Sequence, residues 1–135
     1  MAVNELAITA PRITSFAPQL LVDDLDRAIK FYRDVLGFSF GPTWGGFYAI
    51  GERDGFAIHL KCSPKTIEDR AHRRQREHLD IYAGVIGVQA LYDECRAKGA
   101  IILKPLAPTA WGTSDFYIED PEGYIIAIGE NDNPS

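Results

Sequence analysis

The chain has 135 residues, of which 46% are hydrophobic and 24% charged, and its formal net charge is −5 at pH 7. This composition is typical of one globular domain with an apolar core, and the acidic balance disfavours nucleic acid as a partner. No stretch approaches the ~20 apolar residues that a membrane helix needs, and no basic segment precedes an apolar one at the N-terminus. Cys62 and Cys95 form no metal-binding or disulfide pattern, so we expect a protein of the reducing cytoplasm without a membrane partner.

The first half of the chain reads as a strand, a helix and three further strands. A strand is predicted over 15–22, and Asp23-Asp24 then supply the N-cap of a helix whose apolar residues recur at helical spacing as far as Leu36. Gly37 stands where a C-cap glycine belongs. Glycine-containing turns separate the strands that follow, which are predicted over 38–43, 47–50 and 56–62.

The second half repeats this order of elements. A strand is predicted over 78–83 and a helix over 87–98, with Gly99 as its C-cap. The tetrapeptide 120–123 predicts a type I turn before the last strand. The three strands of this half are predicted over 101–104, 114–119 and 124–129.

The repeat is also visible in single residues, because DGFAIHL at 54–60 aligns with EGYIIAI at 122–128. Element order, glycines and aromatic residues all agree between the halves, and internal repetition sets the architecture of a chain. We therefore predict the α+β class, with two βαβββ modules over 15–62 and 77–130 that form a single domain. A linker over 63–76 joins them, and its basic run is expected to be solvated.

Two separated segments resemble one known family. LLVDDLDRAIKFYRDVLGF at 20–38 resembles the opening module of the vicinal oxygen chelate superfamily, which includes glyoxalase I, extradiol dioxygenases and fosfomycin and bleomycin resistance proteins. WGTSDFYIEDPEG at 111–123 is similar to the closing signature as the bleomycin resistance branch carries it. The resemblance implies the glyoxalase/bleomycin resistance fold, in which curved mixed sheets enclose a cavity. Pro18 stands where bleomycin resistance proteins exchange their first strand, which implies a strand-exchanged homodimer.

Metal-using relatives place their ligands on the first and last strands of each module. The resemblance and the repeat put these positions at Ala17, His59, His78 and Ala127. Alanine has no lone pair, whereas a catalytic metal needs about three protein ligands. We therefore expect no cofactor and no metal ligands, with a weak divalent metal site at His59 and His78 as the alternative.

Two further polar side chains share strand faces with the ligand positions. Gln19 follows Ala17 by two residues, and Asp80 follows His78 in the same way. Each is displaced by roughly 6–7 Å along its strand, which makes it a poor substitute ligand. The histidines then act as polar cavity walls or as ligand contacts.

Aromatic side chains are expected to line the cleft. Tryptophan offers a flat face to planar rings and attracts cations, so we expect a small planar or cationic molecule as the partner. No Ser-His-Asp or Cys-His arrangement is legible, so no catalytic residue is predicted. The predicted ligand-binding residues are Trp44, Phe47, Tyr48, His59, His78, Trp111 and Phe116.

These expectations favour a metal-independent binding protein that resembles the bleomycin resistance proteins. It would confer antibiotic resistance by sequestering a drug in an aromatic cleft at a homodimer interface, without catalysis. Two alternatives stay open: a divergent metal-dependent glyoxalase-like lyase or dioxygenase, and a metabolite-binding accessory module.

Overall fold

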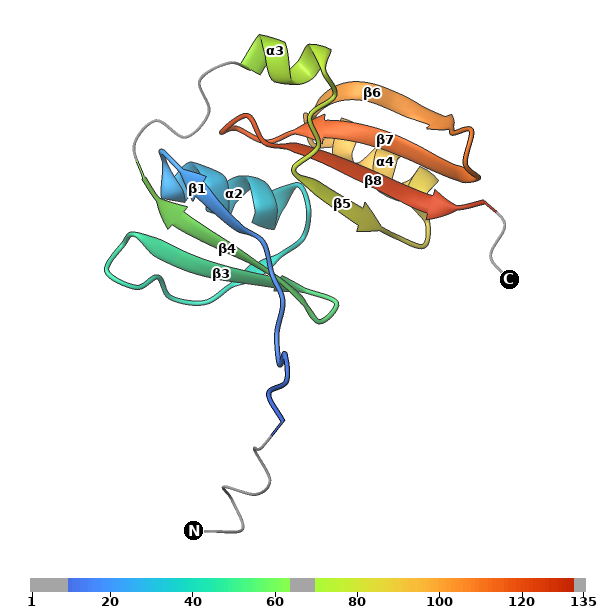
Figure 1. The fold of residues 1–135 in the computed structure, drawn as a ribbon. Helices are drawn as coiled ribbons and strands as arrows, with labels where there is room; N and C mark the ends of the chain where they lie inside the picture. Colours follow the sequence, from blue (N-terminus) through green and yellow to red (C-terminus); the bar gives the residue numbers. More distant parts are fainter. Residues whose placement is uncertain (1–9, 64–69, 133–135) are drawn as a thin grey trace.

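The computed structural model describes residues 10–63 and 70–132, which form two four-stranded mixed sheets (Figure 1). The strand orders are β1-β4-β3-β2 and β5-β8-β7-β6. In each sheet the first strand of the module pairs in parallel with the last, and the other pairs are antiparallel. The predicted α+β class and the repeated βαβββ order are confirmed. The elements are β1 (Gln19–Val22), α2 (Leu25–Asp34), β2 (Ser39–Phe40), β3 (Tyr48–Arg53), β4 (Phe56–Cys62), α3 (Arg70–Gln75), β5 (Ile81–Gly84), α4 (Val88–Ala97), β6 (Ile101–Pro108), β7 (Thr113–Glu119) and β8 (Ile125–Asn131).

The two long helices begin at different kinds of cap. The side chain of Asp24 accepts a hydrogen bond from the Arg27 backbone N–H at 3.1 Å, as predicted for the start of α2. At the start of α4 the cap residue is a glycine, and Glu130 of β8 accepts hydrogen bonds from the first two backbone N–H groups at 2.9 Å each. A carboxylate brought in by the sheet therefore replaces the missing local cap.

Both helices pack on one face of the sheets and share a single apolar core. In β4, Ile58 and Leu60 are buried, while His59 between them is only half-buried. Figure 1 shows α4 behind the second sheet, so the opposite face of that sheet carries no helix. We call the helix-free side of each sheet its open face. On the first sheet the open face carries Gln19, Leu21, Tyr48, Ile50, Ala57, His59 and Lys61.

The open face of the second sheet is filled by its own side chains. Tyr117, Ile125 and Ala127 are buried there in a small cluster, with Leu103 packed against them. Leu103 reaches this side because the register of β6 shifts between Ile102 and Lys104. The two open faces therefore differ, and exposed polar groups remain mainly on the first sheet.

The turn between β7 and β8, over 120–123, joins the two modules at the start of α2. The Tyr32 hydroxyl donates to the Asp120 carboxylate at 2.6 Å, and the Tyr124 hydroxyl donates to the Leu21 carbonyl at 2.7 Å. Asp120 also accepts hydrogen bonds from the backbone N–H groups of Glu122 and Tyr124, at 2.9 Å each. This turn thus links an element of one module to the first strand and helix of the other.

Asp120 is expected to make the stability of the fold depend on pH. Burial raises its pKa to about 6, although hydrogen bonds from Tyr32 and the turn backbone lower it. Because its pKa is raised, Asp120 in its protonated form stabilises the fold. Its contribution to the free energy of unfolding, about 2–3 kcal/mol, is complete below the ordinary aspartate pKa and is lost as pH rises through 6. Urea unfolding at pH 5 and at pH 7.5 measures the loss of stability between the two pH values. This loss should be smaller in Asp120→Asn than in wild type, and an equal loss in both proteins would contradict the assignment.

The linker helix α3 has no buried residue, as expected for a solvated basic run, but three of its arginines also bind the second module. Arg74 donates twice to the Glu119 carboxylate, at 2.7 and 2.5 Å, and that carboxylate is fully buried. Arg73 pairs with Asp80, and Arg70 donates to a carbonyl of the β7–β8 turn. Long arginine side chains reach acids remote in sequence, which charge spacing alone does not reveal. None of the described helices is long and apolar enough to cross a membrane.

Candidate functional site

Three polar side chains meet on the open face of the first sheet. Gln19 of β1 lies directly opposite His59 of β4, and Tyr48 comes from the neighbouring strand β3. The Tyr48 hydroxyl oxygen lies 2.7 Å from His59 Nδ1 and 2.9 Å from Gln19 Oε1. The rings of Tyr48 and His59 are perpendicular, with their centroids 5.7 Å apart. The sheet therefore brings an imidazole, a phenol and an amide together.

Aromatic side chains flank this group on one side. Trp44 forms an isolated bridge with Tyr48, and the two rings meet edge to face at 6.2 Å. Trp44 and Phe47 remain 56% and 52% exposed, since Gly45 and Gly46 between them adopt positive φ and turn the chain. Of the predicted site residues, Trp44, Tyr48 and His59 thus lie in one place, and Phe47 precedes Tyr48 in the chain.

Two other predicted site residues lie elsewhere, in the second module. Phe116 is fully buried on the helix side, where its ring packs on Tyr92 of α4 at 5.0 Å, and the prediction that it lines the cleft is corrected. Alternation along β7 places Tyr117 on the open face instead. Trp111 lies in the turn before β7 and is 70% exposed.

The strand register also changes the ligand position assigned to His78. His59 lies opposite Gln19, and its repeat equivalent Ala127 lies opposite Tyr82. Gln19 therefore corresponds to Tyr82, and Ala17 corresponds to Asp80, two residues beyond His78. The sequence repeat aligns Ala17 with His78, but the register of strand pairing depends on the tertiary structure and aligns Ala17 with Asp80. His78 itself precedes β5 and is exposed, with its backbone N–H bonded to the Arg73 carbonyl at 2.9 Å.

The donors at the four ligand positions do not fit the metal site that the family implies. His59 and Asp80 are potential ligands, but Asp80 pairs with Arg73 and accepts the Ile125 backbone N–H at 2.8 Å. Ala127 is enclosed in the small apolar cluster of the second sheet. Across residues 10–63 and 70–132, no group of three or more histidine, cysteine, aspartate or glutamate side chains could hold a metal ion.

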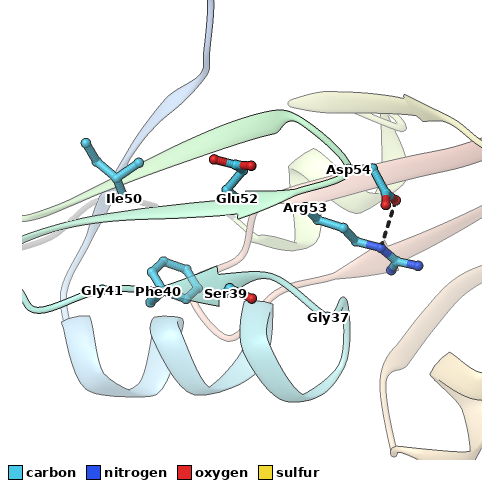
Figure 2. Close-up of a pocket in the computed structure, with 8 residues that line it drawn as sticks. All are labelled: Gly37, Ser39, Phe40, Gly41, Ile50, Glu52, Arg53 and Asp54. Carbon is cyan, nitrogen blue, oxygen red and sulfur yellow. Dashed lines mark ion pairs between the residues drawn. The ribbon is translucent and has the colours of Figure 1, made fainter.

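A hollow of about 710 Å³ lies at the edge of the first sheet, between β2 and β3 (Figure 2). Its lining includes Ile50, which is the β3 residue opposite His59. Arg53 closes one end by pairing with Asp54 at 3.3 Å and donating to the Leu36 carbonyl at 2.7 Å. The residues that line the hollow do not include Gln19, Tyr48 or His59, so the hollow lies beside these side chains and is not formed by them.

The two repeated sheets have the architecture that the sequence resemblance implied, and a comparison with family models identifies the family. Residues 12–128 match the Glyoxalase/Bleomycin resistance protein/Dioxygenase superfamily, and the chain belongs to this family. The resemblance predicted from the two sequence segments is therefore confirmed at the level of the superfamily.

Two curated proteins and one solved structure are similar to this chain over most of its length. The chain is 35% identical over 124 residues to a lactoylglutathione lyase of Haemophilus influenzae, covering 83% of this chain and 88% of the relative. It is 31% identical to a probable lactoylglutathione lyase of Vibrio parahaemolyticus, covering 86% and 89%. Among solved structures, TioX from Micromonospora sp. ML1 matches with a TM-score of 0.70 at 20% identity, over 88% of this chain and 99% of that one. The structural match at this identity supports the fold alone.

These relatives correct two expectations. A non-enzymatic, drug-sequestering protein was the favoured interpretation, and it is wrong because four curated relatives carry the name lactoylglutathione lyase or probable lactoylglutathione lyase. The expectation of no cofactor is wrong on the same ground, since lyases of this superfamily usually use a divalent metal. The alanines at positions 17 and 127 remove two donors, but a missing donor does not by itself exclude catalysis.

Proposed function

We propose that this chain is a glyoxalase-like lyase that acts on the adduct of a thiol with a 2-oxoaldehyde. The proposal rests on its identity of 35% to a lactoylglutathione lyase, which extends over most of both chains. In structural terms it rests on His59, a half-buried imidazole on an open sheet face beside exposed aromatic groups. Fold alone would not support it, because this fold hosts several chemistries.

The reaction rearranges the adduct into a thioester of a 2-hydroxy acid without gain or loss of atoms. The C–H proton of the sulfur-bearing carbon moves to the adjacent carbonyl carbon, and the hydroxyl proton moves between the two oxygens. Imidazole is the most frequent proton-transfer group in enzymes, and transfer by such a group accelerates reactions about 10²–10⁴-fold. In this proposal His59 takes the carbon-bound proton and returns it to the neighbouring carbon.

Thioester formation tests the proposal. The full chain is mixed with methylglyoxal and glutathione, or with another small thiol, and thioester absorbance is followed after dialysis against a chelator and after addition of Zn²⁺, Ni²⁺ or Mn²⁺. Activity in any of these mixtures supports the lyase assignment, and metal content is measured in parallel. Absence of thioester with every thiol and metal would contradict it.

The proposed working unit is a homodimer that binds a small molecule, and its location is the cytoplasm. Exposed apolar side chains support the dimer: before β1, Ile13 and Phe16 are 80% and 90% exposed, and on the open face Leu21 is 39% exposed. Figure 1 shows residues 10–16 extending away from both sheets. Light scattering on the full chain measures the mass, and the mass of a single chain would contradict the dimer.

A further inference from the structure

The Tyr48 hydroxyl lies within hydrogen-bond distance of both Gln19 and His59, but it has only one proton. A tyrosine hydroxyl has one hydrogen to donate, and its oxygen can accept. The neighbour of Tyr48 on one side is Gln19 Oε1, an acceptor, at 2.9 Å. The neighbour on the other side is His59 Nδ1, at 2.7 Å, which donates or accepts according to its tautomer. The direction of the hydrogen bond between Tyr48 and Gln19 therefore decides which partner donates in the hydrogen bond between Tyr48 and His59.

The Tyr48 proton is used in the bond to Gln19, so the Tyr48 oxygen must accept from His59. His59 Nδ1 then carries the proton, and Nε2 of the neutral imidazole keeps its lone pair. We propose that Tyr48 and Gln19 are positioning residues that hold His59 in the Nδ1–H tautomer and so leave Nε2 to accept the substrate proton. This inference rests on the proposed lyase function of the same site.

The fold fixes these three side chains relative to one another. Gln19 and His59 are directly paired across β1 and β4, and Tyr48 is two residues from Ile50, which lies opposite His59. Side chains on adjacent strands are held more accurately than side chains on loops. Trp44 packs its ring against that of Tyr48 and restricts its motion.

The tautomer of His59 can be measured directly by nitrogen-15 NMR of labelled histidines, with His59→Gln used to assign the signals. Wild type is expected to show the Nδ1–H form. Tyr48→Phe removes the acceptor and should shift the tautomer ratio about tenfold toward Nε2–H. Gln19→Leu should invert the preference, because the Tyr48 hydroxyl is then released to donate to Nδ1.

Two variants separate this effect from a general loss of structure. Gln19→Glu keeps an acceptor for Tyr48 and should retain the wild-type tautomer. Tyr82→Phe removes a hydroxyl from the second sheet, where it bonds Asp115 at 3.4 Å, and should not alter the His59 signals. An Nε2–H tautomer in wild type, or identical His59 spectra in Gln19→Leu and Gln19→Glu, would overturn the positioning role.

Enzyme kinetics test whether the His59 tautomer affects catalysis, independently of the NMR spectra. In Tyr48→Phe and Gln19→Leu, kcat should fall about tenfold with a smaller change in KM, and Gln19→Glu should restore it. A shifted tautomer with unchanged kcat would overturn the link between tautomer and catalysis. Wild type with the Nδ1–H tautomer but no lyase activity would support the positioning role and contradict only the proposed function.

Discussion

Replacement of His59 by glutamine is expected to lower kcat for thioester formation about 10²–10⁴-fold, the usual contribution of a proton-transfer group. Glutamine retains a polar side chain of similar length but cannot take up a proton at neutral pH. Its amide can still hydrogen-bond Tyr48, so the sheet should remain folded. Steady-state kinetics with methylglyoxal and glutathione, accompanied by circular dichroism, measure the effect.

The matched control is His78→Gln, which makes the same change at the histidine that sequence alignment placed in the cavity. His78 is exposed and precedes β5, so its replacement should leave kcat and KM unchanged. A larger loss in His78→Gln than in His59→Gln would contradict the site. Equal activity of His59→Gln and wild type would exclude His59 from proton transfer.

Replacement of Glu122 by alanine is expected to lower the free energy of unfolding by about 3 kcal/mol. The Glu122 side chain is only 2% exposed, and its carboxylate receives the Asp23 and Asp24 backbone N–H groups, at 2.5 and 3.3 Å. Arg27 donates to the same carboxylate at 2.8 Å. Glu122 therefore caps α2 from the other module, and its loss leaves N–H groups and a guanidinium without that partner. Urea denaturation measures the change.

Glu130→Ala is the comparison, because Glu130 also accepts two backbone N–H groups at a helix start but within its own module. A cap of this kind contributes about 1 kcal/mol, so the loss should be smaller. Burial alone would raise the pKa of Glu122, but the Asp23 N–H and Arg27 lower it below its ordinary value. Its contribution is therefore present at neutral pH and lost in acid. Equal losses for both variants at pH 7 would contradict the role of the module contact.

Part of the candidate site on the first sheet could be predicted from the sequence. Trp44, Phe47, Tyr48 and His59 are four of the seven site residues predicted from the sequence, and β3, β4 and the turn before β3 bring Trp44, Tyr48 and His59 together. The role of the neighbouring Gln19 could not be predicted from the sequence. Gln19 was considered only as a distant metal donor, because a hydrogen bond to Tyr48 across two strands has no signature along the chain.

Local patterns by themselves determined the βαβββ repeat, the N-cap of α2 and the family, whereas the C-cap of α2 is Val35 and not the predicted Gly37. These depend on neighbouring residues, since helical spacing, strand alternation and turn chemistry act over a few positions. Only the tertiary structure decided that Asp80 corresponds to Ala17, that Phe116 faces α4, and that Arg74 of the linker binds the buried Glu119. Strand register and long side-chain contacts join residues far apart in sequence, and they are selected by packing of the whole chain.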